Sequence, residues 1–206
     1  MKKKINIFIV HGGETFKNQK DYFHYLKTRD VSTKKWISWS GDYLDKKLGA
    51  EFEIIRPRMP LPENAKYKDW KITFEKYLPL LTGDLVLIGN SLGGIFLAKY
   101  LSEHRLPKKT LSVFLVCAPF DNTNSTEDLV GGFVLKSDLS LITKNTKNLH
   151  LLFSKDDEVV PPAHAEKYNR KLPNAHLVIY KSKNGHFRVP TFPEIIKMIK
   201  NDVHSR

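Results

Sequence analysis

The sequence predicts an α/β fold, in which a mostly parallel sheet of six strands lies between two layers of helices as a three-layer α/β/α sandwich. Short apolar runs rich in Val, Ile, Leu and Phe recur along the chain, with helical patterns between them. The runs are continuous rather than alternating, which is typical of strands covered on both faces. Strands that alternate with helices favour a parallel sheet, because a crossover must carry the chain back before the next strand can lie parallel.

The expected strands are six apolar segments. They cover residues 5–10, 52–55, 85–88, 111–117, 149–153 and 176–180. The first segment follows MKKK and imitates a signal peptide, but its six apolar residues end in His11-Gly12-Gly13. A secretory signal needs about 7 to 15 apolar residues and a small-residue cleavage site, so we predict a strand.

Helical periodicity fills the intervals between the strands. An amphipathic pattern with spacing i, i+4, i+7, i+8 and i+11 runs through Trp70, Phe74, Tyr77, Leu78 and Leu81. A second apolar face covers residues 95–101, and we place another helix near residues 39–48. The last helix is predicted behind Thr191-Phe192-Pro193-Glu194, which has the Thr-x-x-Glu form of a capping box with proline in the first turn.

Two long segments fit this alternation poorly. Residues 14–35 are longer than the usual strand-to-helix loop and are rich in Tyr, Phe, Lys and Asp, so we predict irregular chain that forms a possible short lid. Residues 121–147 form a second irregular stretch. Both segments should emerge at the carboxyl ends of strands, where open parallel sheets bind their ligands.

Length and composition indicate one globular domain over residues 1–206. The chain is 41% hydrophobic and 27% charged, and no apolar run approaches the roughly 18 to 20 residues of a membrane-spanning helix. Cys117 is the only cysteine and lies in the apolar run VFLVC, so no internal disulfide is possible. We expect a buried thiol and a cytoplasmic location.

A net charge of +12 raises the question of a polyanionic partner. The lysines are spread along the chain without interleaved stacking aromatics, so specific nucleic-acid binding is not expected. A basic surface exposed to water is the simpler interpretation. A protein that binds polyanions or a membrane surface is one alternative.

The segment Gly89-Asn90-Ser91-Leu92-Gly93 matches G-x-S-x-G directly between an apolar strand and a helical pattern. A serine in this position could be only a helix cap. A strand-to-helix setting, however, makes the pattern a nucleophile elbow, in which the serine is strained and glycines two residues to either side avoid collisions. The helix amino end beside Ser91 favours developing negative charge, and the Leu92 N–H can donate to an oxyanion.

A nucleophilic serine needs a histidine to accept its proton and a carboxylate to orient the imidazole. The fifth strand is followed by a segment that contains Asp156 and Asp157, and the sixth by Asn184-Gly185-His186-Phe187. Both segments should meet Ser91 at one edge of the sheet, in the chain order Ser, Asp, His that accompanies this elbow. Either aspartate could be the acid. His164 is expected on a helix surface.

Through IFIVHGG, IGNSLGG, SKDDEVVP and NGHF the chain resembles the α/β-hydrolase superfamily, and within it the small, cap-poor serine hydrolases related to retinoblastoma-binding protein hydrolases. The resemblance implies a minimal fold that lacks the first two strands of larger members. It implies His186 as the base and Asp157 as the acid, with Asp156 as the rival. It also implies a second oxyanion donor after the first strand, at Gly13, with Glu14 as the less favoured choice.

Two departures from the family pattern concern the substrate. Asn90 stands where histidine is common, and the long segment 14–35 adjoins the donor loop, so we expect Asn90 and Glu14 to bind substrate. No compact metal-ligand spacing, phosphate-binding loop or dinucleotide fingerprint occurs, and neither a metal nor a cofactor is expected.

The residues therefore predict a serine hydrolase that cleaves a small ester, thioester or amide through an acyl-enzyme on Ser91, with a carboxylic ester as the favoured substrate. Its partner would be a small acyl compound. The alternative is a non-catalytic protein of the α/β-hydrolase fold that binds a ligand or a protein, because fold does not dictate function.

Overall fold

The sheet has six strands, all parallel, in the order β2-β1-β3-β4-β5-β6. The computed structural model describes residues 4–34, 37–123 and 128–205, so Lys35 of the expected lid and residues 124–127 of the second long segment lie outside the described residues. The strands are β1 (Ile5–Val10), β2 (Phe52–Ile55), β3 (Leu85–Asn90), β4 (Thr110–Val116), β5 (Thr146–Ser154) and β6 (His176–Tyr180). The predicted parallel sheet is confirmed.

Helices cover both faces of the sheet, which confirms the three layers. One layer contains α3 (Tyr67–Tyr77), α4 (Leu92–Glu103), α5 (Leu141–Asn145) and α6 (Ala163–Lys171), and the other contains α2 (Leu44–Lys47) and α7 (Pro193–His204). Short 3₁₀ turns occupy Pro62–Asn64 and Leu78–Leu80. Side chains of β1 alternate between two cores, with Phe8 and Val10 in the first and Ile7 and Ile9 in the second. Both faces are apolar because both are covered.

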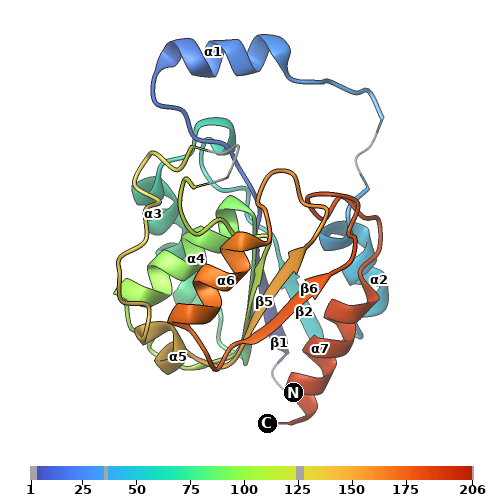
Figure 1. The fold of residues 1–206 in the computed structure, drawn as a ribbon. Coiled ribbons are helices and arrows are strands. Elements are labelled where there is room, and N and C mark those ends of the chain that lie inside the picture. Colours follow the sequence, from blue (N-terminus) through green and yellow to red (C-terminus); the bar gives the residue numbers. More distant parts are fainter. Residues whose placement is uncertain (1–3, 35–36, 124–127, 206) are drawn as a thin grey trace.

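The segment 14–35 contains a helix, so the prediction of irregular chain there is wrong. Helix α1 (Gln19–Thr28) begins after Asn18, whose side-chain oxygen accepts from the Asp21 N–H at 3.0 Å. The pattern Asn-x-x-Asp was the missed signal. None of the residues of α1 is buried. Figure 1 shows α1 beyond the end of the molecule toward which the strands run. A lid role for this segment stays a prediction.

Two other helix predictions need correction. A continuous helix over residues 39–48 does not form, because Gly41, with φ −92° and ψ −129°, breaks the helical conformation inside the wide turn Trp39–Tyr43 that precedes α2. The capping box before α7 does not form, because Phe192 occupies the cap position without a side-chain cap bond. Glu194 accepts instead from Lys183 Nζ at 2.7 Å. Among the described residues no helix is both long and apolar enough to cross a bilayer.

A buried amide ties the end of α4 to the chain that leads into β4. Asn145 is 1% exposed. Its Nδ2 donates to Leu101 O at 2.8 Å and to His104 O at 2.9 Å, and its Oδ1 accepts from the Leu106 N–H at 2.8 Å. One side chain therefore satisfies two carbonyl groups at the carboxyl end of α4 and one N–H group of the chain that follows it.

Asn145→Ala should lower the free energy of unfolding by about 3 kcal/mol, because three buried backbone groups lose their partners. Urea denaturation followed by circular dichroism measures the change. Asn174→Ala, at an exposed position, is the matched control and should change stability by less than about 0.5 kcal/mol. Equal stability of the two variants would contradict the role assigned to Asn145.

Candidate active site

The serine of the G-x-S-x-G segment has an unusual backbone conformation at the junction of β3 and α4. Ser91 has φ 52° and ψ −122°, values that non-glycine residues rarely adopt. Its N–H donates to Val116 O at 2.9 Å, and its carbonyl accepts from the Gly94 N–H at 2.8 Å. The neighbouring strand β4 and the first turn of α4 together hold this strained serine.

The flanking glycines are required by close backbone contacts. A Cβ on Gly89 would lie 2.4 Å from Gly93 O, and a Cβ on Gly93 would lie 2.2 Å from Val10 O. Real Cβ atoms do not approach carbonyl oxygens so closely, so any side chain at either position would push the strand and the helix apart. Because Gly89 and Gly93 have no side chains, β3, β1 and α4 can meet at the turn that carries Ser91.

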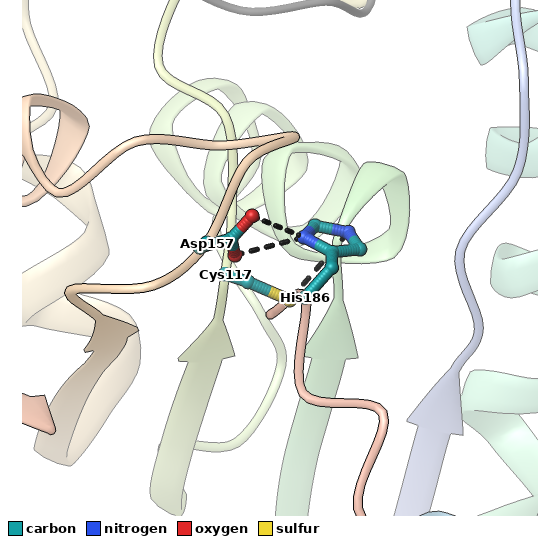
Figure 2. A group of neighbouring side chains, drawn as sticks. All are labelled: Cys117, Asp157 and His186. Atoms are coloured by element: carbon teal, nitrogen blue, oxygen red, sulfur yellow. Dashed lines mark hydrogen bonds and ion pairs between the residues drawn. The ribbon is translucent and has the colours of Figure 1, made fainter. Parts of the chain in front are cut away.

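Asp157 and His186 are hydrogen bonded at the carboxyl edge of the sheet. The Nδ1 atom of His186 lies 2.8 Å from Asp157 Oδ2 and 3.0 Å from Asp157 Oδ1. Figure 2 shows both side chains pointing toward each other from the loops that follow β5 and β6. The Asp157 side chain is fully buried and that of His186 is 13% exposed. The structure therefore brings together two residues that the sequence separates by 29 positions.

Asp157 is fixed by backbone groups as well as by the imidazole. Its Oδ1 accepts from the N–H groups of Val159 at 2.9 Å and Val160 at 2.8 Å. An ionised carboxylate can only accept hydrogen bonds. Nδ1 of His186 is therefore protonated and donates its hydrogen bond to Asp157. In the neutral imidazole Nε2 is then left as the acceptor.

Asp156, the alternative candidate for the acid, has no hydrogen bond to His186 in the described part of the chain and instead binds the neighbouring turn. Asp156 accepts from the Ser154 hydroxyl, from the Ser182 hydroxyl at 2.5 Å, and from the N–H groups of Lys183 at 3.1 Å and Gly185 at 3.0 Å. Hydrogen bonds from the two hydroxyls hold the pKa of Asp156 well below its usual range. Asp156 thus clamps the end of β5 to the turn that presents His186.

The turn around His186 is itself strained. Asn184, Gly185 and Phe187 all have positive φ, at 55°, 70° and 52°. Phe187 is buried at 3% exposure, and Arg188 forms an ion pair with Glu158. Non-glycine residues such as Asn184 and Phe187 keep a positive φ only where surrounding contacts impose it, so the burial of Phe187 helps to fix the direction of the imidazole.

Cys117 is a site neighbour that the sequence analysis did not identify. Its expected burial is confirmed, since the residue is 0% exposed, but its Sγ lies 3.8 Å from His186 Nε2 (Figure 2). The thiol also donates to Asn90 Oδ1 at 3.4 Å. Its position in the sequence could have indicated this. Cys117 comes one residue after β4, and β4 lies next to β3, the strand that leads into the Ser91 turn.

The charges around His186 favour its protonated form more strongly than in an ordinary histidine. Burial by itself lowers the pKa of His186, but the neighbouring Cys117 and Asp157 groups outweigh it, and the pKa is raised. Burial raises the pKa of the Cys117 thiol, which is therefore uncharged near neutral pH. We attribute the upward direction for His186 to the hydrogen-bonded carboxylate of Asp157.

Within the described residues, ligand atoms of Cys117, Asp157 and His186 form the one group of three that could hold a metal ion, all within 4.8 Å of one another. The Asp157 carboxylate is already occupied by His186 Nδ1 and two backbone N–H groups. Cys117 Sγ and His186 Nε2 are then the remaining donors, fewer than the three or four protein ligands of a zinc site. The arrangement fits a proton-transfer pair better than a metal centre.

Two backbone N–H groups are open where oxyanion donors were expected. Leu92 is the first residue of α4, so its N–H has no acceptor within the helix. Across the described parts of the chain no group accepts from the Gly13 N–H, whereas the Glu14 N–H donates to Pro62 O at 2.7 Å. A Cβ on Gly13 would lie 3.3 Å from Leu92 Cδ2. These contacts favour Gly13 over Glu14 as the second donor.

The loop that carries Gly13 is anchored by a histidine. His11 Nε2 accepts from the Met59 N–H at 2.9 Å, so the role of His11 is structural. Burial raises the pKa of the Glu14 carboxyl, and the nearby His186 opposes this, so Glu14 lies within electrostatic reach of the imidazole. Asn90 ends β3, with its side-chain oxygen toward Cys117.

His164 lies on α6 as expected, but the prediction that it faces the surface is wrong. The residue is fully buried, and its Nδ1 accepts from the Phe120 N–H at 3.0 Å. It therefore holds the chain that follows β4.

Comparison with known proteins identifies the same fold and a hydrolase family. The model of a family described as serine hydrolase matches residues 29–194. No curated protein sequence matches the chain.

Several solved structures share the fold along almost the whole chain. The ydeN gene product of B. subtilis is 22% identical with a TM-score of 0.74, and the match covers 98% of this chain and 100% of that one. A putative YdeN-like hydrolase of Pectobacterium atrosepticum is 16% identical with a TM-score of 0.63, covering 96% and 90% of the two chains. An esterase of Pyrococcus furiosus is 16% identical with a TM-score of 0.58, covering 98% and 83%. These similarities show an α/β-hydrolase-like fold for the chain.

The titration of His186 tests the electrostatics of the site. We expect its pKa to lie above the ordinary value near 6.5, and Asp157→Asn to lower it because the variant removes the negative charge beside Nδ1. NMR of the imidazole resonances across pH measures both values. Asp156→Asn is the control and should move the pKa less. An unchanged pKa in Asp157→Asn would show that the carboxylate does not control His186.

Proposed function

The chain belongs to the serine hydrolase family, and we propose that it cleaves a small ester, thioester or amide through an acyl-enzyme on Ser91, with a carboxylic ester as the preferred substrate. The observation that carries the proposal is the hydrogen-bonded Asp157–His186 pair at the sheet edge where the elbow presents Ser91. A serine that served only as a helix cap would need neither this pair nor the close-packed glycines around it.

The first half-reaction forms the acyl-enzyme. Ser91 Oγ attacks the carbonyl carbon as His186 Nε2 takes its proton, and the ionised Asp157 stabilises the resulting imidazolium. The N–H groups of Leu92 and Gly13 donate to the oxyanion, each contributing about 3 kcal/mol of transition-state stabilisation. The bond to the leaving group then breaks, and the leaving group takes the proton from His186.

The second half-reaction releases the acyl group. Water gives a proton to His186 Nε2 and attacks the acyl carbon, and the tetrahedral intermediate uses the same two N–H donors. The bond between Ser91 Oγ and the acyl carbon breaks as His186 returns the proton to Ser91. A carboxylic acid leaves, and every proton moves between groups of this chain, water and substrate.

Two further residues belong to the proposed substrate site. The Glu14 carboxyl is partly buried and within electrostatic reach of His186, so it would disfavour an acyl group that carries its own carboxylate. Asn90 supports the site through Cys117. A free thiol against the imidazole suits a reducing compartment, so we propose that the protein acts in the cytoplasm.

A fluorophosphonate probe tests the proposal directly. The wild-type protein should be labelled at Ser91, because only an activated serine reacts, and Ser91→Ala should lose the label. A series of p-nitrophenyl esters of increasing chain length, with aminoacyl amides beside it, then measures acyl preference. Absence of both labelling and turnover in correctly folded protein would favour the non-catalytic alternative.

Asp157→Asn should reduce turnover by about 10⁴-fold, since an uncharged amide can no longer hold the productive tautomer of His186. Asp156→Asn keeps the size of the side chain. It should reduce turnover by about tenfold or less, because it only loosens the turn that carries His186. Both values come from kcat/KM for one p-nitrophenyl ester. Equal losses in the two variants would show that the acid is assigned wrongly.

A further inference from the structure

Helix α1 exposes apolar side chains to solvent. Phe23 is 48% exposed and Leu26 is 37% exposed. The chain beyond the helix adds Val31 at 85% and Ile37 at 66%. These four are half of the eight large exposed hydrophobic residues found among the described residues, so apolar exposure concentrates in one segment.

The helix has an inner and an outer side. Tyr22 and Tyr25 pack on Phe16, with ring centroids 5.5 Å and 5.1 Å apart, and so face the body of the protein. At about 100° per residue, Phe23 points about 100° away from Tyr22.

On the same helical wheel, Lys27 and Lys20 follow about 40° and 60° beyond Phe23, and Leu26 lies between Phe23 and Tyr22. The outer side therefore presents Phe23 next to the two lysines, and Leu26 lies at the edge of this side, about 40° from Tyr22.

Charge distinguishes the possible partners of this side. Between residues 16 and 34 the chain has five basic residues and two acidic ones. The whole chain carries a net charge of +12, so a second copy would bring a like-charged surface to the same helix. An anionic surface is complementary to it.

An isolated helix of this length needs a covering surface for stability. Helices shorter than about 12 to 15 residues are marginal in water, and α1 has ten residues, none of them buried. Phe16 and the cap at Asn18 support only its inner side and its first turn. Covering Phe23 and Leu26 would stabilise the helix further.

We propose that α1 docks on an anionic phospholipid surface, with Phe23 and Leu26 entering the boundary between headgroups and acyl chains and with Lys20 and Lys27 on the lipid phosphates. A basic amphipathic helix with Phe and Leu on one side binds membranes in this way. Because α1 lies beyond the carboxyl ends of the strands, docking brings the edge that holds Ser91 toward the bilayer (Figure 1). Docking requires no turnover and is independent of the proposed hydrolysis.

Co-sedimentation with vesicles tests the proposal, with Ser91→Ala protein used throughout so that catalysis has no influence. One set of vesicles is phosphatidylcholine alone, and the other is an equal mixture with phosphatidylglycerol. We expect binding to the mixture only, weakened when salt is raised to about 0.15 M. Absence of binding to the mixture at low salt, or equal binding to both sets, overturns the proposal.

Three variants locate the contact. Phe23→Ser with Leu26→Ser should lower the partition coefficient at least about tenfold. Lys20→Gln with Lys27→Gln should lower it about fivefold for each lysine. Ile72→Ser removes an apolar side chain that is 52% exposed on α3 and should bind as the parent does.

Parent-like binding by both the apolar and the lysine double variants overturns the assignment to α1. Circular dichroism checks that the fold is kept, and the lysine pair tests the site even if the apolar pair disturbs the helix. Sedimentation equilibrium tests whether a second copy of the chain, rather than lipid, covers the outer side of α1. A dimer of the parent that Phe23→Ser dissociates would show that a second copy covers this side, and the proposal would be wrong.

Discussion

The position of Ser91 follows from the close approach of β1, β3 and α4 at two glycines. Gly89 and Gly93 leave no room for a Cβ, since one would lie 2.4 Å or less from a carbonyl oxygen. Only because the backbones meet there can the chain turn from strand to helix within one residue. That residue, Ser91, takes a positive φ of 52° and is held by hydrogen bonds to β4 and α4. Strain at the serine is therefore maintained by packing beneath it.

Two adjacent carboxylates divide the task of placing one imidazole. Asp157 is buried, bonded to His186 Nδ1, and sets the tautomer and charge of the ring. Asp156 is turned the other way and binds hydroxyl and N–H groups of the turn from Ser182 to Gly185. The first acts on the ring and the second on the backbone that carries it. Identical side chains one residue apart thus have unlike roles, because the turn that follows β5 directs them toward different partners.

The sheet edge that carries Ser91 and the exposed helix α1 lie at the same end of the molecule. Thr15 follows the donor loop directly, and its hydroxyl links the approach to α1 with the chain after β4 through Asp128 O and the Val130 N–H. Ligands of open parallel sheets bind at this end, so a helix placed there can influence what reaches Ser91. Its outer side adds Phe23 and the charges of Lys20 and Lys27 to that end of the molecule.

Short-range patterns in the sequence were enough to predict the strands and the turn at Ser91. Apolar runs specified the six strands, and G-x-S-x-G between a strand and a helix specified the elbow, because these signals need only neighbouring residues. Errors arose where a short pattern was weak or misleading, as with the Asn18 cap of α1, the break at Gly41 and the capping box that Phe192 replaces.

Three facts come from the folded chain: Asp157 is the aspartate that contacts His186, Cys117 lies against the His186 ring, and His164 is buried. Each of these facts depends on how loops from different strands fold over a common edge. Separations such as the 29 residues between Asp157 and His186 carry no periodicity that a sequence pattern could reveal.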